Sequence, residues 1–359
     1  MDPIETILEK RFPGYRALTT SRGSTALFLA LKAVADERGY GEVIVPSTVC
    51  PSVPFTIALS GFQPRFCDVD LEMFCLSPAT IAPHLSERTK AIVAVYLFGK
   101  SFNPVPLVKL ASQKGFSLIE DIAQAVGGEY EGRLLGGFGD FSVLSFDDTK
   151  IIRGTGGALL VRDGRFLERV LRHREALDVV EPEILRELSR GFRDLTMGLY
   201  DTLRSEEFRE PADLGTRFFE KFRRLFIHQR VPADTDEVTA LQDLSLLERE
   251  REARFINYSA YERQLRPDIW RVSFSRREMC WRLPVLANDH RQQLRIIERI
   301  RSEGGLVSNH YFPCSYAFGE RGGENARQIG LRAVNLWVDS KVSEDDILRH
   351  CQVINELIV

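Results

Sequence analysis

Short apolar runs alternate with segments of helical periodicity through the first half of the chain. Runs typical of buried strands occupy 42–47, 63–70 and 90–99, and the segment 106–115 has the length and pattern of a helix. Strands that alternate with helices at these lengths are typical of parallel crossover units. The pattern therefore predicts an α/β fold with a mostly parallel central sheet.

The apolar pattern changes in the second half of the chain. Between about 165 and 235, apolar residues recur at intervals of three and four, which predicts helices. A long helix is expected at 239–265, and the rest of the chain is expected to form a compact α+β unit in the order β-α-β-β-α. We predict a large domain over 1–245, with a helical insertion at about 165–235, and a small C-terminal domain over 246–359.

Composition indicates a small molecule as the partner of the protein. The 359 residues suggest two domains, and the formal net charge is −3. This charge gives no reason to expect nucleic acid or an acidic membrane surface. Arginine and glutamate are intermixed in the helical insertion, which favours solvated helical faces.

No targeting or membrane segment is expected, so we predict a cytoplasmic protein. The N-terminus lacks an apolar signal-peptide core, and the longest apolar candidate, 43–62, is broken by prolines. The six cysteines include no C-x-x-C pair, so neither a zinc site nor a disulfide framework is expected.

The candidate chemistry gathers between residues 117 and 161. One predicted strand ends in Glu120 and Asp121, with Gln124 a turn further on, and a second delivers Ser145 and then Lys150 ahead of a glycine cluster. Open α/β sheets bind ligands at the carboxyl ends of their strands. Taken singly, an acid after a strand is commonly a helix cap, and a lysine before glycines is commonly a solvated surface residue.

Taken together, these groups suit pyridoxal phosphate. Lys150 would form the Schiff base, Asp121 would keep the pyridinium nitrogen protonated, and hydroxyls with backbone N–H groups would hold the phosphate. A second anion site is predicted where Gly23, Ser24 and Thr25 open a helix, because first-turn N–H groups are unpaired and lie at the positive end of the dipole. An ordinary helix cap would give the same short pattern.

Three segments carry a resemblance to a known family. IEDIAQA, GGFGDF, and SFDDTK followed by GTGG resemble the signature segments of the DegT/DnrJ/EryC1/StrS aminotransferases, which read near I-E-D-A-A-Q-A, G-x-x-G-D and S-F-x-x-x-K. The resemblance covers most of the chain except roughly 170–235. It implies a type I pyridoxal-phosphate transferase fold with a small C-terminal α+β domain. It also implies a homodimer that moves an amino group from glutamate to a keto sugar, nucleotide-linked in our interpretation.

The resemblance also implies roles for individual residues. Lys150 would carry the cofactor and shuttle the proton, and Asp121 would pair with the ring nitrogen. Gln124 would contact the ring or its phenolic oxygen. Gly23, Ser24 and Ser145 would hold the phosphate. His310 and Tyr311 lie where the family places residues near the substrate, although a tyrosine at such a place often only packs.

The sequence departs from the family at two places. Cys50 stands where most members carry an aromatic residue that stacks on the cofactor ring. An Asn-Tyr-Arg segment that reaches the neighbouring subunit's phosphate is not visible, and 228–238, with Gln229 and Arg230, occupies its place. These departures leave a non-catalytic relative as the alternative. A dehydratase is the other alternative, but that branch of the family has histidine in place of Lys150.

The acceptor site is expected to be walled by the insertion and by the 308–328 loop. Arginines suited to a diphosphate are Arg172, Arg174, Arg223, Arg224, Arg230 and Arg321.

Overall fold

The computed structural model describes residues 2–204, 211–228 and 234–358. The elements of the first part are α1 (Pro3–Arg11), β1 (Arg16–Thr20), α2 (Gly23–Arg38), β2 (Glu42–Pro46), α3 (Ser52–Leu59), β3 (Gln63–Cys67), α4 (Pro78–Ile81), β4 (Thr89–Val95), α5 (Val105–Lys114), β5 (Ser117–Asp121), β6 (Glu129–Tyr130), β7 (Arg133–Leu134), β8 (Phe141–Phe146) and β9 (Gly156–Val161). Those of the second part are α6 (Gly164–Glu175), α7 (Pro182–Arg204), α8 (Pro211–Phe226), α9 (Asp234–Ser245), α10 (Leu247–Gln264), β10 (Arg282–Leu286), α11 (His290–Ser302), β11 (Val307–Ser308), the short 3-10 helix η3 (Cys314–Phe318), α12 (Glu324–Arg332), β12 (Ala333–Trp337) and α13 (Glu344–Leu357).

The central sheet has seven strands in the order β1-β9-β8-β5-β4-β2-β3. Strands β8, β5, β4, β2 and β3 run parallel, and β9 is antiparallel to both of its neighbours. Strands β5 and β9 are buried along their whole length, as expected where helices cover both faces of a sheet. The predicted α/β class with a mostly parallel sheet is confirmed.

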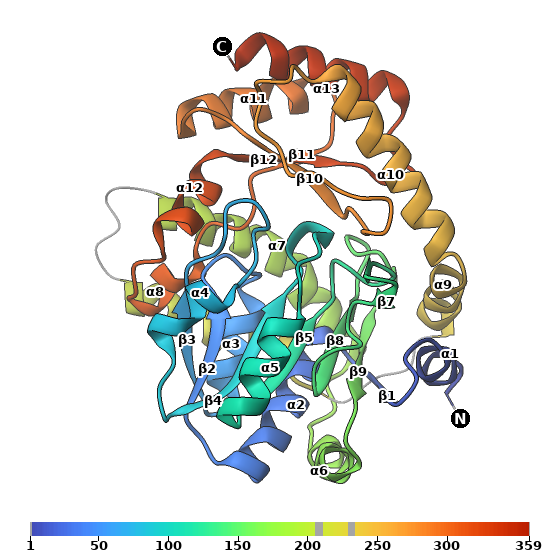
Figure 1. Cartoon of the computed structure of the whole chain (residues 1–359), viewed down its shortest axis with the longest axis vertical. Helices are drawn as coiled ribbons and strands as arrows, with labels where there is room; N and C mark the ends of the chain where they lie inside the picture. The colour runs from blue at the N-terminus through green and yellow to red at the C-terminus, as the bar shows by residue number, and fades with distance from the viewer. Residues whose placement is uncertain (1, 205–210, 229–233, 359) are drawn as a thin grey trace.

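The C-terminal part of the chain lies above the carboxyl edge of this sheet (Figure 1). A three-stranded antiparallel sheet, β10-β12-β11, packs beneath α11 and α13, and α10 runs up its side. The elements follow the predicted β-α-β-β-α order, with α12 added before β12. The boundary after residue 245 stays a prediction.

The long helix expected at 239–265 is two helices, so this prediction is wrong in detail. Helix α9 ends at Ser245, and α10 begins at Leu247. The hydroxyl of Ser245 donates to the backbone carbonyl of Gln242 at 2.7 Å, and Leu246 leaves the helical conformation at φ −107° and ψ 9°. A serine hydroxyl that bonds to a nearby carbonyl competes with the helical hydrogen bonds, which accounts for the break.

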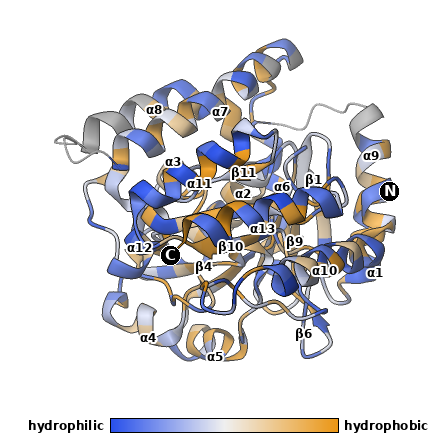
Figure 2. Cartoon of the chain, turned by 90° about the horizontal axis from the view of Figure 1, so that it is seen from above, coloured by the Kyte–Doolittle hydropathy of each residue, from blue (hydrophilic) through white to orange (hydrophobic). Residues whose placement is uncertain are grey.

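The helical insertion is α6, α7 and α8, as the periodicity predicts. Helices α7 and α8 run side by side along one edge of the molecule (Figure 2). Their apolar faces build a second core against α3 and η3. Its buried members are Phe55, Leu199, Tyr200, Leu203, Phe218, Phe222, Leu225, Phe226, Phe312, Cys314 and Ala317. The pair α7–α8 is therefore fixed to segments that lead directly into the predicted site.

Candidate active site

Asp121 ends β5, and its carboxyl group lies at the carboxyl edge of the sheet. The side chain is 9% exposed, and Oδ1 accepts a hydrogen bond from the N–H of Ala123 at 3.0 Å. Burial raises the pKa of this carboxyl group, while the Ala123 N–H and the charge of Lys150 lower it. The charge of Lys150, which follows a different strand, therefore acts on Asp121.

Lys150 lies in the turn that follows β8. Its backbone N–H donates to the carbonyl of Asp147 at 2.7 Å, and Asp147 Oδ1 accepts from the N–H of Thr149 at 2.9 Å. The Lys150 Nζ lies 5.1 Å from the centroid of the Trp281 ring. Trp281 precedes β10 in the C-terminal part, and sequence reasoning did not find it because no local pattern distinguishes it from a core residue.

The start of α2 lies against the ends of β8 and β9. A Cβ atom on Gly23 would lie 2.8 Å from the Cβ of Ser145, and one on Gly157 would lie 2.6 Å from the Gly23 nitrogen. Only glycine permits this approach. The structure thus places Ser145 beside the first turn of α2. Among the described residues, the backbone N–H groups of Gly23, Ser24 and Thr25 have no hydrogen-bond partner.

The Ser24 hydroxyl points towards the end of α8. It donates to the carbonyl of Phe226 at 2.6 Å, and the hydroxyl of Ser21 donates to the carbonyl of His228 at 2.6 Å. An anion at the start of α2 would therefore meet the N–H of Ser24 and not its hydroxyl. Only the backbone N–H of Ser24 is therefore available for the predicted phosphate contact.

Gln124 joins the two parts of the chain. Its Oε1 accepts from the N–H of Phe98 at 2.6 Å, and its Nε2 donates to the hydroxyl of Tyr311 at 2.7 Å. Tyr311 is buried and has a φ of 75°, which non-glycine residues rarely adopt. Such backbone strain is typical of functional positions, so Tyr311 is more than packing in our interpretation. Cys50 is half-buried, and its Sγ lies 3.2 Å from the Ser52 hydroxyl.

The arginines expected around the acceptor site do not form one group. Arg172 pairs with Asp36 at 2.8 Å, near the C-terminal end of α2. At 1.5 Å per residue this is roughly 20 Å from the start of that helix. The expectation for Arg172 is therefore wrong. The side chains of Arg223, Arg224 and Arg321 are exposed. Gln229 and Arg230 lie outside the described residues.

The donor set fits pyridoxal phosphate. A buried carboxyl group lies within reach of the charge of a lysine, and a hydroxyl lies beside three N–H groups, unpaired among the described residues, at a glycine too crowded for any side chain. The carboxylate suits the ring nitrogen of the cofactor, and the lysine suits its carbonyl carbon. The hydroxyl and the N–H groups suit its phosphate.

The fold is that of type I pyridoxal-phosphate aminotransferases. A solved aminotransferase from Helicobacter pylori, PseC, which is involved in the biosynthesis of pseudoaminic acid, superposes on 99% of this chain with a TM-score of 0.79. The two chains are 18% identical, and the match covers 90% of the solved chain. Residues 5–178 of the chain match the DegT/DnrJ/EryC1/StrS aminotransferase family. This match covers slightly less than half of the chain.

The two curated relatives described here each match less than half of this chain. GDP-perosamine synthase of Escherichia coli O157:H7 is 37% identical over 156 residues, which is 43% of this chain and 43% of that protein. L-glutamine:2-deoxy-scyllo-inosose aminotransferase of Streptomyces paromomycinus is 39% identical over 149 residues, or 41% of this chain and 35% of that protein. The chain thus spans less than half the length of these relatives.

Proposed function

We propose that the protein is a pyridoxal-phosphate-dependent aminotransferase that moves an amino group from an amino acid to a keto sugar. The observation that carries the proposal is the buried Asp121 carboxyl group at the carboxyl edge of the sheet, on which the charge of Lys150 acts. The match of residues 5–178 to an aminotransferase family supports it. The cofactor, when bound, withdraws electrons from the carbon that carries the amino group and so makes its hydrogen acidic.

The residues of the chain divide the remaining work. Lys150 carries the cofactor and, once released, moves a proton to and from the substrate carbon. Asp121 holds a proton on the ring nitrogen, because a buried anion stabilises a cation next to it. The N–H groups of Gly23 and Ser24 and the hydroxyl of Ser145 hold the phosphate. Gln124, fixed by Phe98 and Tyr311, lies where it orients the ring or its oxygen.

The substrates are inferred from the names of the relatives. Glutamate is the proposed donor, and glutamine is the donor to compare with it because one relative is named for L-glutamine. The acceptor is a keto sugar, and a nucleotide link is proposed because another relative is named for a GDP-sugar. An acceptor screen should therefore include nucleotide-linked and free keto sugars, with a nucleoside diphosphate as competitor. Equal use of free sugars without such competition would refute the nucleotide link.

Homodimerisation and a cytoplasmic location complete the proposal. The described part of the chain contains no helix with the length and apolarity that a membrane crossing requires. The small net charge supports small-molecule partners and not nucleic acid. Light scattering at micromolar concentration tests the homodimer, and an active monomer would contradict it.

Borohydride trapping tests the function itself. The purified protein, loaded with cofactor and reduced, should yield a peptide with the cofactor fixed on Lys150. Lys150→Ala should still bind cofactor but lose turnover with glutamate. A protein that takes up no cofactor would be the non-catalytic relative, and an adduct on Lys90, Lys100 or Lys114 would refute the assignment.

A further inference from the structure

Arg22 is the residue that precedes the first turn of α2, and its side chain makes no capping hydrogen bond. The side chain is half-buried, and its only hydrogen-bond contact among the described residues is Nη1 to the Ser189 hydroxyl at 3.5 Å. The guanidinium forms no ion pair within this part of the chain. Asp147, whose charge acts on Arg22, uses Oδ1 to accept from the N–H and hydroxyl of Thr149. Burial lowers the pKa of Arg22.

His228, on which the charge of Arg22 acts, is a second residue with an unsatisfied polar group among the described residues. The residue is 2% exposed, and its ring hydrogen-bonds with the carbonyl of Arg224 while Nδ1 has no partner among the described residues. Ser21, which directly precedes Arg22 in the chain, donates from its hydroxyl to the His228 carbonyl at 2.6 Å. The charge of Arg22 acts on the imidazole and, together with burial, lowers its pKa to about 4.

Arg22 directly precedes the three N–H groups at the start of α2 that are unpaired among the described residues, and His228 is joined to Ser21 beside them. A cation partly removed from water and left without an anion is unfavourable, and so is a buried polar nitrogen without a partner. One bound anion would relieve both, and the helix start would favour it further. The anion must be compact and carry several acceptor oxygens, because guanidinium and N–H donors approach it from different elements. A phosphate monoester has these properties.

We propose that Arg22 is the cation that binds the cofactor phosphate, supplied by the same chain and held in place by the helices α7 and α8. His228, on which the charge of Arg22 acts, contributes to the same anion site through Nδ1, which takes up a proton when the phosphate binds. This proposal rests on the proposed function. It assigns to the insertion the task of completing the phosphate site, because Ser189 comes from α7 and His228 follows α8.

Cofactor affinity with and without the phosphate group tests the proposal. Dissociation constants for pyridoxal phosphate and for pyridoxal should be measured by absorbance for the wild type, Arg22→Gln, Arg22→Lys and Arg16→Gln. Arg16 is the matched control, since it is an exposed arginine that pairs with Glu9 at 2.7 Å. Melting temperatures show whether each variant folds. Arg22→Gln removes no helix-capping hydrogen bond, because the Arg22 side chain makes no such bond to α2.

We expect Arg22→Gln to weaken pyridoxal phosphate by about tenfold to hundredfold, the usual value of a hydrogen bond to a charged group. The affinity for pyridoxal should not change, Arg22→Lys should recover part of the loss, and Arg16→Gln should match the wild type. An equal loss for both compounds would mean that Arg22 only supports the fold, and no loss for either would remove it from the site. Both outcomes overturn the proposal.

Inorganic phosphate separates this proposal from the proposed function. Phosphate should raise the melting temperature of the cofactor-free wild type but not that of Arg22→Gln. This result in a chain that never binds pyridoxal phosphate would support the anion site and refute the aminotransferase. GDP that stabilises the cofactor-loaded wild type, but not loaded Arg22→Gln, would assign Arg22 to a diphosphate of the acceptor and overturn the proposal.

Discussion

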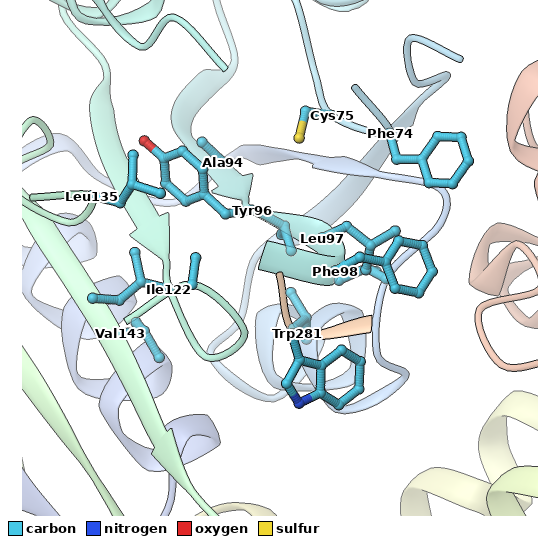
Figure 3. Close-up of a cluster of buried hydrophobic side chains, with 14 of the residues drawn as sticks. Phe74, Cys75, Ala94, Tyr96, Leu97, Phe98, Ile122, Leu135, Val143 and Trp281 are labelled. Carbon is cyan, nitrogen blue, oxygen red and sulfur yellow. The ribbon is translucent and has the colours of Figure 1, made fainter. Parts of the chain in front are cut away.

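The Nζ of Lys150 lies 5.1 Å from the centroid of the Trp281 ring, and the indole is fixed where it meets the lysine. Trp281 donates from its backbone N–H to the Phe98 carbonyl at 2.7 Å and from Nε1 to the Thr149 carbonyl at 2.9 Å. Figure 3 shows the Trp281 indole below Phe98 in a cluster of buried hydrophobic side chains. The guanidinium carbon of Arg282 lies 4.3 Å from the same ring. The C-terminal part thus provides a rigid aromatic surface for the lysine.

We expect Trp281→Leu to slow turnover by about three- to thirtyfold, because it removes a cation–π contact of about 0.5–2 kcal/mol and the hydrogen bond to the lysine turn. Trp281→Phe should lie between it and the wild type, since a ring face remains. Trp337→Leu is the control, because it removes the other ring on which Arg282 stacks, at 3.9 Å, without touching Lys150. The measurement is kcat beside the melting temperature. Equal kcat in the two leucine variants would show that Trp281 only packs.

Asp121→Asn should keep the fold and lose the chemistry. The change removes the negative charge that holds the proton on the ring nitrogen, so removal of the substrate hydrogen should slow by orders of magnitude, with each ~1.4 kcal/mol giving tenfold. Exchange of the α-hydrogen of glutamate with deuterated solvent, followed by NMR, reports this step directly. An exchange rate near that of the wild type would end the assignment of Asp121.

Glu120 directly precedes Asp121 in the chain, and its substitution should lower the stability of the fold. It is fully buried and accepts hydrogen bonds from the Tyr96 hydroxyl at 2.7 Å and from the N–H groups of Gly136, Phe138 and Gly139 at 3.0, 2.6 and 2.6 Å. Glu120→Gln places an amide donor against these donors and should lower the free energy of unfolding by about 2–4 kcal/mol. Urea denaturation measures this loss. Stability equal to that of the wild type would mean that the carboxylate does not hold the 136–139 turn.

Acid should destabilise the cofactor-free protein through His228. Its pKa is lowered from 6.5 to about 4 by burial and by Arg22, so the unfolded chain binds the proton more tightly than the folded chain. Stability from this group is complete above pH 6.5 and is lost as the pH falls towards 4. Between pH 7 and pH 5 the loss should be about 2 kcal/mol. His228→Gln should lose correspondingly less over the same range, and an unchanged pH dependence would contradict the buried neutral imidazole.

The sequence alone determined the features that depend on neighbouring residues. The alternation of strands and helices, the glycine at the start of α2, and the positions of Asp121 and Lys150 at strand ends all follow from periodicity and short spacings. Parallel strands align their carboxyl ends, so the meeting of these two side chains could also be expected. The break between α9 and α10 could not, because it depends on one serine rotamer.

Only the tertiary structure decided which side chains face the site. The Ser24 hydroxyl turns to α8 because the insertion packs there, and Arg172 is remote because α6 packs on the far end of α2. Trp281 contacts Lys150, and His228 contacts Ser21 beside the start of α2, from segments distant in sequence, through contacts that no local pattern records. Periodicity shows which face of an element is buried, but the partner of that face is set by the packing of the whole chain.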